Sequence, residues 1–258
     1  MNVVLTGAAG VIGGAVREHL GERYDFVSIT RKPAAFSNLV ADIADFDAIL
    51  PAFEGADAVV HLAASISVDS PWDAVLHDNL IGTYNVYEAA RRGGATCIVF
   101  ASSNHTIGGY ELDGAPRIYA LDDPRSYDHH AEIRPDSLYG VSKVYGEALG
   151  RYYHETYGMR VYNLRIGSVR GDNDPTAEGV RDGSFWLDLT DAQKYERMRS
   201  TWLSQRDCAE LIGCCLEATT VPWATVYGIS DNPRQFWDLE HARRLLGYAP
   251  KDSAPEHP

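Results

Sequence analysis

The chain has 258 residues, a formal net charge of −13 at pH 7 and a sequence pI near 5.0. Its length allows one large α/β unit with a small second one. The acidic balance argues against nucleic acid or an anionic membrane as a partner, because the field of the protein would repel both. We therefore expect a soluble enzyme that acts on small molecules.

Cysteine usage and the N-terminal sequence favour a cytoplasmic protein. The cysteines have spacings that suit neither zinc nor a disulfide framework. They are Cys97, Cys208, Cys214 and Cys215. A strand pattern begins at Asn2, and no stretch approaches the ~20 apolar residues of a membrane span. The sequence thus predicts reduced thiols, no signal peptide and no membrane anchor.

A strand pattern, a glycine-rich turn and a helical pattern open the chain. Residues 2–6 are mostly apolar, residues 7–13 read GAAGVIG, and the helical pattern runs through Leu20. Glycines at this junction permit a tight turn and the close approach of a pyrophosphate, whose charge meets the free N–H groups of the helix. The sequence predicts a dinucleotide site that includes Gly7, Ala9, Gly10, Val11, Ile12 and Gly13.

The end of the second predicted strand, residues 25–29, bears on the cofactor. Folds that prefer NAD usually have an acidic residue here, which holds the ribose 2′-hydroxyl. This chain has Thr30, Arg31 and Lys32 instead. The two cations could hold a 2′-phosphate, or they could form only a solvated turn. We therefore expect NAD or NADP, with a leaning toward NADP through Arg31.

Further strands are predicted at residues 38–41, 58–62 and 96–101, and a long helix at 72–92. This alternation predicts an α/β fold with a doubly wound parallel sheet, a Rossmann fold, and right-handed crossovers. Ligands bind at the carboxyl edge of such a sheet. The residues at these strand ends are Asp42, Ile43, Leu62, Ala63, Ala64, Ala101, Ser102, Ser103, Asn104 and His105.

Residues 109–135 are rich in Asp, Arg, Pro and His and lack clear periodicity. The length of the segment indicates an active-site flap. His129 and His130 within it could indicate a metal, but no carboxylate or cysteine stands at a supporting spacing. We expect no metal site.

Tyr139 and Lys143 begin another helical pattern four residues apart, so they share one helix face. A free tyrosine titrates near ~10, and an adjacent ammonium favours its ionised form. Such a pair can act as a general base, although the spacing alone is common. The apolar stripe of this helix is broader than one sheet face needs, which indicates a second contact with a partner subunit.

The rest of the chain predicts a small substrate-binding lobe. We expect a dinucleotide-binding domain over residues 1–166, ending in a strand at 160–166, and a C-terminal lobe over 167–258. Residues 167–195 are polar and acidic, which suggests a lid loop. The later elements are a helix at 205–218, a strand at 224–229 that returns to the main sheet, and a helix at 239–246.

In this order, the glycine turn, Ser103 and the Tyr139–Lys143 pair resemble the extended short-chain dehydrogenase/reductases, also called the NAD-dependent epimerase/dehydratase family. The runs VFASSNHTIG, LYGVSK, RIGS and STWL are most similar to uronate dehydrogenases and to archaeal NAD-dependent glucose-6-phosphate dehydrogenases. The resemblance implies a catalytic triad of Ser103, Tyr139 and Lys143. It also implies cofactor contacts from Asn79, Ala101 and Ile166, and substrate contacts from Ser67, Ser103, Asn104, His105, Tyr139, Ser168 and Arg197.

Two departures concern the cofactor and the substrate. Thr30 stands where an acidic residue is expected, and the loop at 169–196 is longer than in uronate dehydrogenases. Residues 148–154 and 226–232 look closer to the sugar-phosphate branch. The short C-terminal part fits a small sugar better than a sugar nucleotide.

The resemblance implies oxidation of a small anionic sugar at C1 to its lactone, with Tyr139 as the base, Ser103 holding the reacting oxygen and Lys143 binding the cofactor ribose. Arginine suits a carboxylate or a phosphate, so Arg197 would hold the acid group, unless it forms a surface ion pair with Glu196 or Asp191.

The alternatives are a sugar-6-phosphate dehydrogenase, an epimerase or dehydratase that keeps its NAD, and a non-enzymatic sensor of NAD(P). The resemblance also implies a homodimer through the helices at 72–92 and 139–157.

Overall fold

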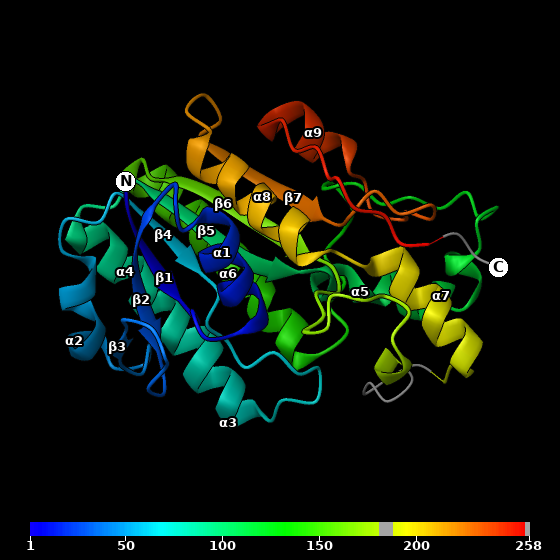
Figure 1. Cartoon of the computed structure of the whole chain (residues 1–258), viewed down its shortest axis with the longest axis horizontal. Helices are drawn as coiled ribbons and strands as arrows, with labels where there is room; N and C mark the ends of the chain where they lie inside the picture. The colour runs from blue at the N-terminus through cyan, green and yellow to red at the C-terminus, as the bar shows by residue number, and fades with distance from the viewer. Residues whose placement is uncertain (181–187, 256–258) are drawn as a thin grey trace.

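The computed structural model describes residues 1–180 and 188–255, and it is built on one seven-stranded sheet (Figure 1). The strand order is β3-β2-β1-β4-β5-β6-β7, and every pairing is parallel. The predicted doubly wound Rossmann sheet is therefore confirmed. The strands are β1 (Asn2–Thr6), β2 (Asp25–Thr30), β3 (Leu39–Val40), β4 (Ala58–His61), β5 (Cys97–Ser103), β6 (Arg160–Ile166) and β7 (Trp223–Gly228).

The central strands are apolar on both faces because helices cover both. Val3 and Leu5 of β1 belong to one buried cluster, and Val4 between them belongs to another. Successive side chains of a strand point to opposite faces, so an unbroken apolar run fills two core layers.

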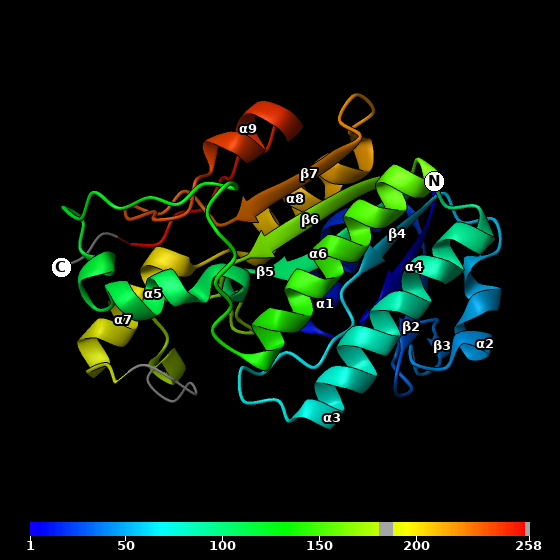
Figure 2. The ribbon, with the colours of Figure 1, turned by 180° about the vertical axis from the view of Figure 1, so that it is seen from behind.

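Helices α1 (Val11–Leu20) and α8 (Gln205–Glu217) cover one face of the sheet, and α4 (Gly82–Gly93) and α6 (Leu138–Tyr157) lie side by side on the other (Figures 1 and 2). In the described ranges, no helix has the length and apolar character to cross a lipid bilayer. The shorter helices are α2 (Phe46–Ile49), η1 (Leu50–Phe53), α3 (Trp72–Ala74), the π-helical η2 (Val75–Ile81), η3 (Asn104–Ile107), α5 (Gly108–Gly114), η4 (Arg117–Tyr119), η5 (Glu178–Val180), α7 (Asp191–Thr201) and α9 (Glu240–Leu246).

Helix α6 begins against the end of β5. The Ser137 hydroxyl caps it by accepting from the Gly140 N–H at 3.0 Å. A Cβ on Gly140 would lie 2.4 Å from the His105 carbonyl oxygen, so only glycine allows this close approach. The first turn of α6 is thereby pressed onto η3, which puts Tyr139 beside Ser103.

The segment at 109–135 differs from the expected flap. It contains most of α5 and all of η4, and its later part forms a parallel bridge between Tyr127 and Trp237. Tyr127 also stacks on Tyr110 with the ring centroids 4.4 Å apart. Its apolar side chains therefore pack on the C-terminal part of the chain.

The predicted lid loop at 167–195 is wrong at its C-terminal end, where α7 begins at Asp191. Thr190 and Gln193 form a capping box that starts this helix. Residues 181–187 lie outside the described residues, and the lid role stays a prediction. Strand β7 pairs with β6 in the main sheet, and the division into two domains at residue 166 also stays a prediction.

Candidate active site

A pocket of about 400 Å³ opens beyond the carboxyl ends of β4, β5 and β6. Its walls come from segments far apart in the chain, because parallel strands all end at this edge. It brings together all seven residues expected to contact substrate: Ser67, Ser103, Asn104, His105, Tyr139, Ser168 and Arg197. Ile12, Leu62, Ala101, Lys143 and Ile166 line it too.

Tyr139 is the phenol of the site and is buried in the pocket wall. Its side chain is only 8% exposed, and its ring meets the His105 ring edge-on with the centroids 5.7 Å apart. Burial raises the pKa of Tyr139 to about 12, while a hydrogen bond with Ser103 acts to lower it and the Asp136 charge to raise it. The phenol alone therefore keeps its proton at neutral pH.

Lys143 is directed to the backbone of β5. Its Nζ donates to the Ala101 carbonyl oxygen at 2.7 Å and lies 5.6 Å from the centroid of the Tyr139 ring. Burial lowers the pKa of Lys143 to about 7. The sequence predicted that this ammonium lowers the pKa of Tyr139, but burial disfavours the charged form of both groups, and the pKa of Tyr139 is raised.

Ser103 ends β5, and its hydroxyl lies within the pocket wall. The Oγ atom accepts from the His105 N–H and donates to Asn104 Oδ1, both at 3.2 Å. Because the same hydroxyl lies within hydrogen-bond reach of Tyr139, the two side chains can meet on one oxygen atom of a bound ligand.

His105 is fixed by a carboxylate that the sequence did not single out. His105 Nδ1 lies 2.7 Å from Asp136 Oδ2, and the Asp136 side chain is 1% exposed. A Cβ on Gly108 would overlap this carboxylate, so the glycine makes room for it. Only the folded arrangement of η3 against the start of α6 reveals this pair.

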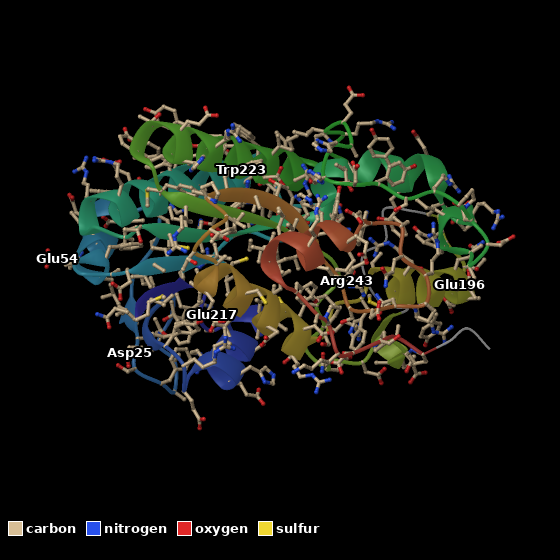
Figure 3. The ribbon with its side chains drawn as sticks, turned by 90° about the horizontal axis from the view of Figure 1, so that it is seen from above. Asp25, Glu54, Glu196, Glu217, Trp223 and Arg243 are labelled. Atoms are coloured by element: carbon tan, nitrogen blue, oxygen red, sulfur yellow. The ribbon has the colours of Figure 1, made fainter. Side chains whose placement is uncertain are left out.

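Arg197 lines the pocket as expected. The predicted alternative, a surface ion pair with Glu196 or Asp191, is wrong. Its Nε and Nη2 atoms donate to the two Glu111 oxygens at 2.8 and 3.2 Å, and the pair is buried. The Tyr119 hydroxyl donates to the same carboxylate at 2.8 Å. Helix α5, which the sequence did not predict, brings Glu111 next to α7. Figure 3 shows Glu196 of α7 at the end of the molecule opposite Glu54.

The cofactor residues expected from the sequence lie along the same edge of the sheet. A smaller pocket of about 150 Å³ is lined by Gly7, Arg31, Asp42, Ile43, Ala63 and Ala64. A hollow at the start of α1 is lined by Ala9, Gly10 and Val11. Of the expected cofactor residues, Gly13 and Asn79 are absent from the described linings of these two sites and of the larger pocket.

The glycine turn has the form that a pyrophosphate requires. Gly7 has φ +69°, and a Cβ on it would lie 2.8 Å from the Ala63 nitrogen. A Cβ on Gly13 would lie 2.4 Å from the Gly7 oxygen, so Gly13 serves the packing of α1 on the turn. Gly10 is the N-cap of α1, where the first N–H groups of a helix have no partner within the helix. The turn therefore fits a dinucleotide.

Asn79 does not line these three sites, and its side chain instead links two parts of the fold. Its side chain accepts from the Ser65 N–H at 2.7 Å and donates to the Ser65 carbonyl and to Ser142 Oγ, each at 2.9 Å. It thus joins the loop after β4 to α6, the helix that carries Tyr139.

Arg31 stands where expected, at the end of β2. Its guanidinium is 67% exposed, and its Nη1 atom donates to Asp78 Oδ2 at 3.0 Å. Asp78 also lines the smaller pocket. The arginine that favoured NADP therefore already has an acidic neighbour.

The fold and these pockets define a dinucleotide-dependent enzyme of the short-chain dehydrogenase/reductase type, and comparison with known proteins agrees. Residues 3–217 match the model of the NAD dependent epimerase/dehydratase family. The chain belongs to this family.

Three relatives cover 98% of the chain. An NAD-dependent glucose-6-phosphate dehydrogenase of Haloferax volcanii is 38% identical and is covered over 94% of its length. An L-arabinose 1-dehydrogenase (NAD(P)(+)) of the same organism is 39% identical and is covered over 97%. The structure of a mutant uronate dehydrogenase of Agrobacterium tumefaciens complexed with NAD is 34% identical, is covered over 85%, and superposes with a TM-score of 0.79.

Proposed function

We propose that this protein oxidises a small anionic sugar at C1 to its lactone and transfers the hydride to NAD or NADP. One observation carries the proposal: Ser103, Tyr139 and Lys143 line a single pocket at the carboxyl edge of a Rossmann sheet. The three relatives described above, which are sugar dehydrogenases that use or bind NAD or NAD(P), support it.

Tyr139 accepts the proton of the sugar's anomeric hydroxyl. A phenol with a pKa near 12 does so only when further positive charge stabilises its anion, since each pKa unit corresponds to about 1.4 kcal/mol. NAD, when bound, supplies the hydride acceptor and a positively charged ring. Lys143, when protonated, adds a second positive charge.

Ser103 and Lys143 orient the reactants. The Ser103 hydroxyl donates to the sugar oxygen that loses its proton, which keeps that oxygen within reach of Tyr139. Lys143, fixed by its bond to the Ala101 carbonyl, has further N–H donors for the hydroxyls of the cofactor ribose. The His105–Asp136 pair holds a ring donor or acceptor toward the sugar.

The acid group of the sugar is assigned to the side of the pocket formed by Arg170 and Arg197. Each of these arginines is bound to a carboxylate of the protein, Asp172 or Glu111. A substrate carboxylate or phosphate would therefore share the arginines with these acids. A sugar phosphate is the second candidate, because a glucose-6-phosphate dehydrogenase is 38% identical over nearly the whole chain.

A screen with both cofactors tests the proposal. The panel contains glucuronate, galacturonate, glucose 6-phosphate, L-arabinose and glucose, and the readout is accumulation of reduced nicotinamide. The proposal expects the highest kcat/KM with one of the sugar acids. Interconversion of sugars without net reduction would instead identify an epimerase.

We infer that the protein is a homodimer and that the outer face of α3, η2, α4 and α6 forms the interface. Apolar side chains gather there, each between 42% and 50% exposed: Trp72, Ile81, Tyr84, Val141, Tyr152 and Tyr157. Figure 2 shows that α4 and α6 run alongside each other on this face. Large exposed apolar areas usually mark an interface. Light scattering at micromolar concentration should give a dimer mass, and a monomer would contradict the inference.

A further inference from the structure

Four titratable side chains, Arg31, Asp78, His77 and Asp42, form a connected row beside the smaller pocket. Arg31 Nη1 donates to Asp78 Oδ2 at 3.0 Å, and Asp78 Oδ1 lies 2.9 Å from His77 Nδ1. His77 Nε2 in turn lies 3.8 Å from Asp42 Oδ2. The hydrogen bond with Asp78 raises the pKa of His77. Both oxygens of Asp78 are therefore engaged, and one of them holds Arg31.

The row comes from two sides of the pocket. Arg31 follows β2 and Asp42 follows the edge strand β3, whereas Asp78 belongs to η2 on the far side of the loop after β4. Arg31, Asp42 and Asp78 all line the pocket. The 2′-phosphate of NADP, if it entered this pocket, would meet Arg31 and the carboxylates of Asp42 and Asp78. The Asp78 side chain is only 15% exposed, so water screens its charge poorly.

We propose that Asp78 is a specificity-determining residue that disfavours NADP, because it occupies Arg31 and repels a 2′-phosphate in the adenosine pocket. The inference rests on the proposed dinucleotide site. Asp78 of η2 would thus discriminate between NAD and NADP, because the end of β2 has no acidic residue that could do so. NADP binds only if Arg31 leaves Asp78, whereas the uncharged 2′-hydroxyl of NAD makes no such demand.

The test compares the Kd values of NAD and NADP for the substrate-free protein by fluorescence titration, so it does not depend on turnover. A chelator is present because ligand atoms of Asp42, His77 and Asp78 lie within 4.8 Å of one another and could hold a stray cation. Asp78→Asn keeps the shape and removes the charge. Asp73→Asn, an exposed site one turn earlier along the same helical stretch, is the matched control for net charge.

Asp78→Asn should tighten NADP roughly tenfold or more and change NAD little, because a freed arginine gains a charge-assisted bond to phosphate. In the Arg31→Ala background, where only the repulsion by Asp78 remains, the gain from Asp78→Asn should be much smaller, and Asp73→Asn should show no gain in either background. If the Asp78→Asn protein does not fold, Asp78→Ser serves as a second uncharged variant.

Equal changes for the two dinucleotides in Asp78→Asn, or a gain for NADP of the same size with and without Arg31, would overturn the inference. A wild-type protein that binds neither dinucleotide would contradict the proposed cofactor site itself. The two failures are therefore distinguishable.

Discussion

The two ends of the ligand-binding edge each contain an arginine that the sequence assigned to an anion, and they differ in burial. Arg197 at the proposed sugar site, the sugar end, is 8% exposed and bound to Glu111, which is 2% exposed. Arg31 at the proposed adenosine site, the adenosine end, is 67% exposed as a side chain. A buried pair that loses one partner leaves an uncompensated charge, but an exposed pair exchanges its partner for water or ligand at little cost.

The comparison separates a structural pair from an exchangeable one. The Arg197–Glu111 pair holds α7 against α5, the two helices that lie together beyond the ends of the strands (Figures 1 and 2). The Arg31–Asp78 pair joins β2 to η2 at the surface. The sugar end should therefore respond to mutation in activity and stability, and the adenosine end in cofactor affinity.

The largest effect is expected from Tyr139→Phe at the sugar end. Losing the proton acceptor should lower kcat by about 10²–10⁴-fold, while the Kd of the cofactor stays nearly unchanged. Tyr24→Phe is the matched control, because Tyr24 and Tyr139 are both 8% exposed. A Tyr139→Phe variant that keeps more than about a tenth of wild-type kcat would contradict the assigned base.

Arg197→Ala should give the next largest effect, a loss of about 3–5 kcal/mol in the free energy of unfolding, because Glu111 is left buried without its partner. Urea denaturation measures it, with Glu196→Gln in the same helix as the control. Arg197→Met combined with Glu111→Leu should restore most of the stability.

The stable double variant also tests the contact with the sugar. It should lose roughly ten- to a hundredfold in kcat/KM for an anionic sugar and little for a neutral aldose. An equal loss on both kinds of sugar would mean that Arg197 only holds α7 in position.

The buried Lys143 predicts a pH dependence of stability. Its pKa is about 7 in the folded protein against 10.5 for a free lysine side chain, so the unfolded chain binds the extra proton between these pH values. The free energy of unfolding of the wild type relative to Lys143→Met should therefore rise as the pH increases from about 7 to 10.5. A difference in the free energy of unfolding that is flat with pH would contradict this assignment.

The smallest effect on stability is expected from Arg31→Ala, under about 1 kcal/mol, because the Arg31 side chain is largely exposed and Asp78 keeps its contact with His77. Its effect on binding should be selective. NADP should weaken roughly tenfold, because a contact to phosphate is lost, and NAD should change little. Equal weakening of NAD and NADP would mean that Arg31 is only part of a solvated turn and makes no contact with the phosphate.

The sequence placed the glycine turn, the strand ends and the Tyr139 helix correctly because their signals are local. The positive φ of Gly7 and the cap at Ser137 belong to single turns of the chain, although the close approach of Gly7 to Ala63 does not. The start of α7 had a signal of the same kind, since Thr190 and Gln193 form a capping box. Recognising that box would have shortened the predicted loop.

The acidic partners were not predictable because they come from distant segments. Arg197 and Glu111 are 86 residues apart, and Arg31 and Asp78 are 47 apart. Nothing in either neighbourhood specifies such a contact before the tertiary structure forms. The pKa of Tyr139 was misjudged for a related reason, because burial dominates it and burial is a property of the whole fold.

The central claim is that hydride leaves C1 of the sugar in the pocket that contains Tyr139. It is tested most directly with the sugar acid that the screen selects, deuterated at C1, incubated with the wild-type protein and the oxidised cofactor. Mass spectrometry of the reduced cofactor should show one deuterium per turnover, together with the lactone or its hydrolysed acid, and Tyr139→Phe should give almost none. Turnover of the same sugar with no deuterium in the reduced cofactor would contradict oxidation at C1.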